Sequence, residues 1–223
     1  MDGNGRWANK RLLPRIAGHK KGLEALEVII KSAVTYHIST ITSYAFSTEN
    51  WNRPDEEIKG LMNLFSESIT NQTNKLIKNN IRVRVIGDTE IFTKELQAKI
   101  KYLENKTSKN TGLNLNIALN YGARSEILMA VNKFYKDSKS SKVSMLETDL
   151  NDNLYTKKMP DVDLLIRTGG QRRLSNFLLW QVAYSELYFI DTLWPDFSEK
   201  DFVNALYFFQ NTERKFGNLK VDK

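Results

Sequence analysis

The sequence predicts a single α/β domain over residues 1–223, with a mostly parallel central sheet flanked by helices. Strand-like and helix-like stretches alternate along nearly the whole chain, which is typical of parallel α/β folds. Of the 223 residues, 41% are hydrophobic and 11% aromatic, which is enough for one sizeable core and excludes a disordered chain. The sequence contains no internal repeat, low-complexity tract or convincing linker, so we expect one domain.

The first half of the chain predicts two helices with a strand between them. GLEALEVIIKSAVTY at 22–36 is amphipathic, and its apolar helical face consists of Leu23, Leu26, Ile30, Ala33 and Val34. HISTITSYAF at 37–46 predicts a strand. Pro54 and an acidic first turn predict the start of a long helix that continues from Asp55 to Asn79. Its apolar stripe consists of Ile58, Leu61, Met62, Phe65 and Ile69.

The second half continues the alternation. We expect strands at 81–88, 113–122, 162–170 and 186–190, and helices at 92–105, 125–135, 176–184 and 198–216. DSKSSKV at 137–143 is a polar surface segment. Ligands of open α/β sheets bind where strands end and helices begin. FSTENWNRP at 46–54, NYGAR at 120–124 and RTGGQRRLSN at 167–176 follow three of these strands, so we expect the chemistry at one edge of the sheet.

The opening stretch, MDGNGRWANK, indicates a metal–diphosphate site. Gly3 and Gly5 permit close backbone approach, and Arg6 supplies donors that suit diphosphate oxygens. Asp2 would repel an anion unless a divalent cation stood between them. Several other arginines lie in or beside Gly, Ser, Thr or Asn clusters, which indicates two anionic groups held together. These arginines are Arg15, Arg53, Arg167 and Arg173.

Composition and missing motifs exclude several other classes. The chain has no cysteine, which excludes disulfides and thiolate chemistry and fits a reducing cytosol. GNGRWA matches the dinucleotide pattern G-x-G-x-x-A, but no strand precedes it; Walker A and G-x-S-x-G sequences are absent. No signal peptide or membrane-spanning run is visible. The net charge of +7 and the pI of 9.4 favour an anionic partner, which could be nucleic acid, a membrane surface or a phosphorylated small molecule, although lysine-rich surfaces are often simply solvated.

Six motifs together resemble the cis-prenyltransferase family, and most closely its bacterial undecaprenyl diphosphate synthases. They are MDGNGRWA, R-x-x-G-H at 15–19, YAFSTENWNRP, LNYGAR, DLLIRTGGQRRLSNFLLWQVAYSELYF and LWPDF, and they cover residues 1 to about 217. The resemblance implies Mg²⁺-dependent, stepwise condensation of isopentenyl diphosphate onto farnesyl diphosphate. The product would be a long Z-polyprenyl (undecaprenyl) diphosphate, the precursor of the lipid carrier for cell-wall polysaccharide. It also implies a cytoplasmic homodimer, peripheral at the inner face of the membrane during product release, and no nucleic-acid partner.

The resemblance also assigns roles to particular residues. Asp2 would hold Mg²⁺ and assist departure of the primer's diphosphate, and Glu186 would be the second metal ligand. The primer's diphosphate would lie against Gly3, Asn4, Gly5, Arg6, Trp7, Arg15 and His19. Asn50 would assist proton removal as an orienting group, because a neutral amide is a poor base. The same pocket would contain Ser47, Thr48, Glu49, Trp51 and Arg53, and the isopentenyl diphosphate would bind Arg167, Arg173, Leu174 and Ser175.

Each assignment has a structural alternative. Asp2 would be a frayed terminal residue, His19 a helix-cap partner and Asn50 part of an Asx turn before Pro54. Trp51 would be core, and Glu186 would simply end a helix. The growing lipid needs a hydrophobic tunnel, which we expect between the sheet and the helices at 23–34 and 55–79. Its walls would include Leu23, Leu26, Leu61, Leu64 and Phe65, which periodicity alone assigns to an ordinary core.

Four features depart from the family pattern. A hydrophobic strand usually precedes M-D-G-N-G, whereas this sequence begins at Met1, so we expect a misassigned start or a truncation. Gln171 replaces the glutamate of R-T-G-G-E, Ala123 replaces a glycine, and Lys215 replaces the arginine of a C-terminal R-x-G. Gln171 and the missing strand keep open a catalytically weak, prenyltransferase-like binding subunit. A basic nucleic-acid-binding protein is disfavoured because the aromatic residues follow apolar patterns.

Overall fold

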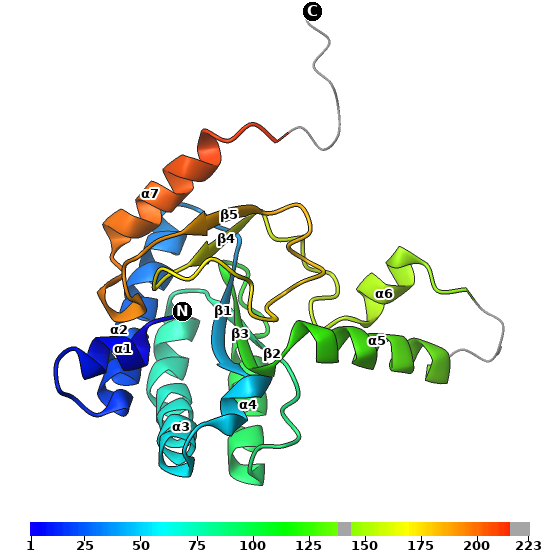
Figure 1. Cartoon of the computed structure of the whole chain (residues 1–223). Helices are drawn as coiled ribbons and strands as arrows, with labels where there is room; N and C mark the ends of the chain where they lie inside the picture. The colour runs from blue at the N-terminus through cyan, green and yellow to red at the C-terminus, as the bar shows by residue number, and fades with distance from the viewer. Residues whose placement is uncertain (138–143, 215–223) are drawn as a thin grey trace, which may run out of the picture.

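The structure is a computed structural model that describes residues 1–137 and 144–214 (Figure 1). Its first half contains α1 (Asn4–Asn9), α2 (Arg15–Thr35), β1 (Thr40–Ser47), a 3-10 helix (Thr48–Asn52), α3 (Asp55–Lys78), β2 (Arg82–Ile86), α4 (Lys94–Thr107) and β3 (Asn114–Tyr121). Its second half contains α5 (Ala123–Asp137), α6 (Glu147–Asn153), β4 (Leu164–Arg167), β5 (Glu186–Phe189), a short 3-10 helix (Trp194–Asp196) and α7 (Glu199–Gln210). The predicted alternation of strands and helices is confirmed.

All strand pairs are parallel, as predicted, but the hydrogen-bonded strands form two groups. One has the order β1-β3-β2 and the other pairs β4 with β5. A cavity of about 480 Å³ lies between β1 and β4 and is lined by residues of both strands. Met1 also lines this cavity, and the backbone N–H of Asp2 donates to Thr168 Oγ1 just beyond β4 at 3.0 Å. The first residues of the chain therefore lie between the two groups of strands.

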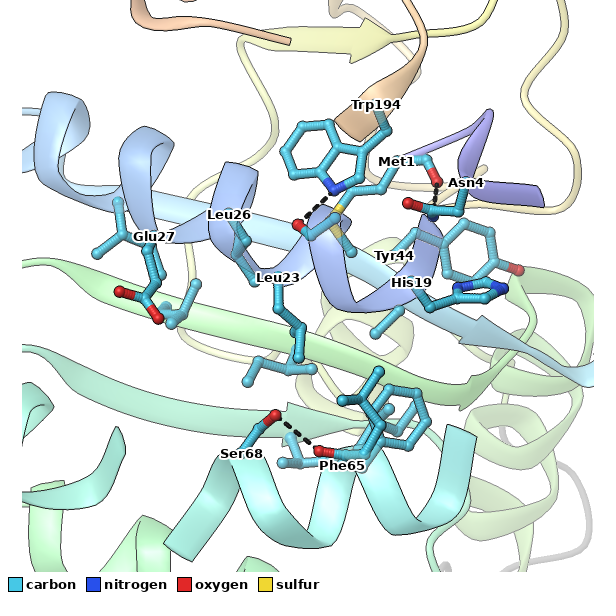
Figure 2. A pocket seen from close by; sticks show the side chains of 18 of the residues that line it. Met1, Asn4, His19, Leu23, Leu26, Glu27, Tyr44, Phe65, Ser68 and Trp194 are labelled. Carbon is cyan, nitrogen blue, oxygen red and sulfur yellow. Dashed lines mark hydrogen bonds between the residues drawn. The ribbon is translucent and has the colours of Figure 1, made fainter. Parts of the chain in front are cut away.

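The main core lies between the three-stranded group and helices α2, α3 and α4. Buried apolar residues of these elements form one continuous cluster, to which Phe202 of α7 also belongs. The N-terminal half of α2 packs closely on α1, because Gly18 and Gly22 leave room for Asn4. Trp194 Nε1 donates to the carbonyl oxygen of Gly22 at 2.8 Å and ties the short 3-10 helix to α2 (Figure 2). These contacts fix the amino-terminal glycine turn against α2.

Two expected elements differ from the structure. The predicted helix at 176–184 is wrong, because this segment forms turns in which Ser175, Asn176 and Leu178 have φ values of 50°, 62° and 47°. Such left-handed conformations cannot continue a right-handed helix. The closing helix is shorter than expected, since α7 ends at Gln210. Residues 215 and 216 of that prediction lie outside the described residues, as do residues 138–143 of the polar segment and Lys215.

The sequence reasoning did not predict the short helices α1 and α6. Within residues 1–137 and 144–214, no helix combines the length and the apolar character needed to cross a bilayer.

Candidate active site

A cavity of about 960 Å³ lies between the three-stranded group and helices α2 and α3, where the tunnel was predicted (Figure 2). All five expected wall residues line it, namely Leu23, Leu26, Leu61, Leu64 and Phe65. Leu61 and Phe65 are at the same time 1% and 9% exposed, so they also belong to the core. The polar part of the lining contains Asp2, His19, Ser47, Glu49, Asn50, Arg53, Arg167, Arg173 and Ser175.

Asp2 joins two arginines that are far apart in the sequence. Its carboxylate lies 3.2 Å from Arg6 Nη2 and 3.0 Å from Arg167 Nη2. Partial burial would raise the pKa of Asp2, but the hydrogen bonds and charges of Arg167 and Arg6 lower it below its usual value. The carboxylate is therefore ionised at neutral pH. Asp2 is also held by its backbone, which bonds to Thr168 and Trp194, so it is not a frayed residue.

Two glycine-rich segments meet beside Asp2. Gly3 directly precedes α1 with a φ of 114°, and Gly169 follows β4 with a φ of 83°. Arg6 Nη1 donates to the carbonyl oxygen of Gly169 at 2.7 Å. Arg15 covers Gly5 so closely that a Cβ placed on Gly5 would lie 2.5 Å from the guanidinium carbon. The structure therefore brings the residues of the proposed primer site together.

Glu57, in the first turn of α3, organises the cationic side chains of this site. Its side chain is 7% exposed and accepts from Arg15 Nε at 2.7 Å and from Arg53 Nη1 at 3.2 Å. His19 Nε2 lies 3.3 Å from Glu57 Oε1, the oxygen that also accepts from Arg53. Burial would raise the pKa of Glu57, but Arg15, Arg53 and His19 lower it. Sequence reasoning missed this role, because the acidic residues at 55–57 were interpreted only as a helix start.

His19 is held in its neutral form. Burial lowers the pKa of its imidazole, the charge of Arg53 lowers it further, and Glu57 opposes both effects. A neutral imidazole has one donor and one acceptor nitrogen, so it can donate to an anion without adding a full charge.

The segment after β1 presents Asn50 to the cavity in a fixed orientation. Asn50 Oδ1 accepts from the backbone N–H of Ser47 at 3.0 Å. This hydrogen bond caps the start of the 3-10 helix at Ser47. It is not the Asx turn before Pro54 that was the structural alternative for Asn50. The oxygen therefore has one acceptor position in use, and Asn50 Nδ2 has two N–H donors. Asn50 can donate to an oxygen acceptor, and as a neutral amide it is a poor base.

Arg167, Arg173 and Ser175 are also brought together. Arg167 Nη1 donates to Ser175 Oγ at 2.8 Å and to the carbonyl oxygen of Arg173. Arg173 Nη1 donates to Gln171 Oε1 at 2.6 Å, so the glutamine at this position still supplies an acceptor for Arg173.

Asn176 is a second residue that sequence reasoning missed. Its Nδ2 donates to Glu49 Oε1 at 2.9 Å, and its Oδ1 accepts from the backbone N–H of Arg124 at 2.9 Å. Its backbone carbonyl oxygen accepts from the N–H of Ala123. Asn176 thus connects the segments that follow β1, β3 and β4. Its left-handed φ could not be predicted from a sequence pattern.

Several expected site residues do not reach the cavity. Trp51 packs against Phe46 and Phe92 and donates to Asn120, so it occupies a core position, as its structural alternative stated. Trp7 donates to Asp196, and Leu174 packs against the cluster around Tyr121. Several other expected residues are also not among those that line the larger cavity, namely Gly3, Gly5, Arg6, Arg15, Thr48 and Leu174. Arg6 and Arg15 are connected to it through their ion pairs with Asp2 and Glu57.

Glu186 lies apart from Asp2 in this chain. It pairs with Leu164 at the beginning of β5, whereas Arg167, which bonds Asp2, pairs with Phe189 at the other end. Three residues correspond to about 10 Å along a strand, and their side chains alternate between faces. Within the described parts of the chain, no three His, Asp or Glu side chains are grouped so that they could hold a metal ion.

Comparisons with known proteins show what the whole chain is similar to. A family profile described as "Putative undecaprenyl diphosphate synthase" matches residues 1–217. An isoprenyl transferase from Clostridium perfringens is 47% identical over 99% of this chain and 88% of that protein. A ditrans,polycis-undecaprenyl-diphosphate synthase ((2E,6E)-farnesyl-diphosphate specific) from Wigglesworthia glossinidia brevipalpis is 48% identical over 98% of this chain and 85% of that protein. The crystal structure of lavandulyl diphosphate synthase from Lavandula x intermedia, in complex with dimethylallyl diphosphate, superimposes with a TM-score of 0.91 at 32% identity, covering 98% and 95% of the two chains.

Proposed function

Because this chain belongs to the undecaprenyl diphosphate synthase family of prenyltransferases, we propose that it condenses isopentenyl diphosphate repeatedly onto farnesyl diphosphate to form undecaprenyl diphosphate. The observation that supports this function best is the cavity itself, whose apolar walls lead to a cluster of arginines around one carboxylate. Such a cavity fits a ligand with an anionic head and a long hydrocarbon tail.

The reaction needs two diphosphates side by side. The C1–O bond of the allylic primer breaks and releases diphosphate, the double bond of isopentenyl diphosphate forms the new C–C bond, and C2 of the isopentenyl unit loses a proton. In our proposal Arg6, Arg15 and His19 hold the departing diphosphate, and Arg167, Arg173 and Ser175 hold the incoming one. Preorganised donors stabilise the negative charge that develops on the leaving group. The Asn50 amide nitrogen orients the oxygen that accepts the proton.

The site also fits a magnesium ion, which Asp2 would hold beside the bound diphosphate. Mg²⁺ is typically held by one or two carboxylates together with phosphates and water, so one ionised carboxylate beside a diphosphate site is a suitable donor set. The ion would supply charge neutralisation for the departing diphosphate. We propose Asp2 as the metal ligand from this chain. The role of Glu186 as the second metal ligand stays a prediction.

We also propose that the protein acts as a homodimer in the cytoplasm and contacts the inner face of the membrane when it releases its lipid product. The net charge of +7 favours an anionic membrane surface.

The test is incubation with labelled isopentenyl diphosphate and farnesyl diphosphate, with Mg²⁺ or with EDTA, followed by extraction and chain-length analysis. We expect a long product that depends on Mg²⁺ and disappears in Asp2→Ala. Absence of product, together with retained binding of farnesyl diphosphate, would contradict the enzyme and support the binding-subunit alternative.

A further inference from the structure

A polar bridge crosses the apolar wall of the larger cavity between α2 and α3. Glu27 of α2 accepts from Gln72 Nε2 at 2.6 Å and from Lys75 Nζ at 2.7 Å, both on α3. All three side chains line the cavity. We call Glu27, Gln72 and Lys75 the α2–α3 clasp.

The clasp lies well away from the arginine cluster. Glu27 follows His19 by eight residues on α2, which is about 12 Å along the helix axis. In Figure 2, Glu27 lies beyond Leu23 and Leu26, on the side opposite to His19 and Tyr44. The cavity continues past it, since Ile30 and Val34 of the same helix also line it. A chain growing away from the diphosphates would therefore pass the clasp partway along the cavity.

The clasp lies at the boundary between the cavity and solvent. The Glu27 side chain is 35% exposed and that of Lys75 is 52% exposed, whereas the neighbouring wall residues Leu64 and Ile69 are 7% and 8% exposed. An apolar chain cannot replace the hydrogen bonds of a carboxylate or an ammonium group. A chain that forced the two helices apart would have to break both clasp bonds and gain no bond to the chain in return, although water can hydrate the exposed part of each group.

We propose that the α2–α3 clasp fixes the spacing of the two tunnel helices and thereby limits the length of the product. This inference rests on the proposed function, and it assigns to Glu27, Gln72 and Lys75 a role in product specificity. As long as the tail fits between the helices, the clasp stays closed. Further units require the helices to separate, so addition stops when the space is filled.

The main test compares products of Glu27→Leu with those of a matched variant, Glu24→Leu. Glu24 is on the same helix and is ion-paired with Lys21 at 2.6 Å, but it is 66% exposed and is not a lining residue. We expect the product distribution of Glu27→Leu to move to chains longer by at least one isoprene unit, and that of Glu24→Leu to stay unchanged. The charge reversal Glu27→Lys with Lys75→Glu should return the wild-type distribution. Equal distributions in all variants, or equal shifts in Glu24→Leu and Glu27→Leu, would overturn the proposal.

A second measurement does not depend on catalysis. Because the chain has no cysteine, spin labels can be attached at Val28→Cys on α2 and Asn71→Cys on α3, both exposed positions. We expect Glu27→Leu to broaden and lengthen the distance distribution between the labels. An unchanged distribution would overturn the clasp even if the protein formed no product, whereas missing product with a broadened distribution would count against the proposed function alone.

Discussion

Arg15, His19 and Arg53 come from different parts of the chain, and one carboxylate, that of Glu57, orients all three. Arg15 and Arg53 would repel each other without it. The Glu57 side chain is 7% exposed, whereas those of Arg15 and Arg53 are 46% and 30% exposed, so without Glu57 water would solvate the guanidinium groups but would not hold them in place. The geometry of the proposed primer site therefore depends on a residue that does not itself line the cavity.

Glu57→Gln tests this dependence. We expect KM for farnesyl diphosphate to rise about tenfold or more, because a neutral amide holds the two guanidinium groups less strongly. Glu56→Gln, an exposed neighbour in the same turn, is the control and should leave KM unchanged. Steady-state kinetics with varied farnesyl diphosphate concentration measure KM for both variants. Equal KM values would refute the role of Glu57.

The neutral state of His19 has a consequence for stability at acid pH. Its pKa is lowered in the folded chain, so between that value and the ordinary value of about 6.5 the unfolded chain binds the additional proton. The free energy of unfolding should therefore fall as the pH falls below about 6.5. Urea unfolding at pH 7 and pH 5.5 should show a smaller loss for His19→Asn than for the wild type. The same loss in both proteins would contradict this account.

At the scale of the elements, periodicity predicted the long helices well and failed at one short segment. The predicted stripes at 23–34 and 58–69 each cover about three turns. Both helices end within one residue of the expected bounds, but α2 begins at Arg15, seven residues before the expected start. NFLLWQVAY at 176–184 has the same apolar pattern. However, the side chain of Asn176 bonds to Glu49 and to the backbone of Arg124, and with these contacts Asn176 has a left-handed backbone. These contacts span 127 and 52 residues, so no local pattern contains them.

We expect that the contact between α1 and α2 leaves no room for an added methyl group at Gly18. In Gly18→Ala the added Cβ would overlap the carbonyl oxygen of Asn4. We expect a loss of about 1–3 kcal/mol in stability and weaker binding of inorganic diphosphate, because the glycine turn at residues 3–6 must move.

The control for this prediction is Gly60→Ala on α3. Its Cβ would meet only the flexible end of Ile16, at 3.2 Å. Alanine has a higher helix propensity than glycine, so stability should change by less than about 1 kcal/mol. Thermal unfolding and calorimetric titration with diphosphate measure both effects. A Gly18→Ala protein that behaves like Gly60→Ala would contradict the close α1–α2 contact.

At the scale of the whole molecule, motifs predicted which side chains belong to the site, whereas only the folded chain shows how they are connected. Asp2, Arg6, Arg53, Arg167 and Arg173 were all named from the sequence. The hydrogen bonds that connect the segments of the site, from Arg15 to Glu57, from Asn176 to Glu49 and from Arg6 to Gly169, span 42, 127 and 163 residues. The cavity wall was predicted from the same stripes that predict a core, because both need apolar side chains at helical spacing.

Ile30→Trp should shorten the product. Ile30 lines the cavity on α2, eleven residues or about 16 Å beyond His19, so the first additions have room and later ones do not. Val28→Trp is the control, since Val28 is 40% exposed and does not line the cavity. Chain-length analysis should show products shorter by a few isoprene units for Ile30→Trp alone. Unchanged lengths in that variant would contradict the use of this cavity by the tail.

The double contact of Asp2 with Arg6 and Arg167 has a consequence for how successive cycles connect. After each condensation in the proposed reaction, the lengthened molecule carries the diphosphate of the isopentenyl unit, so its head lies at Arg167 and Arg173. The next cycle needs that head at Arg6 and Arg15. Because a single carboxylate touches an arginine of each group, at 3.2 Å and 3.0 Å, the two stations adjoin. The head can be translocated between them in one short step, without release of the intermediate into solution.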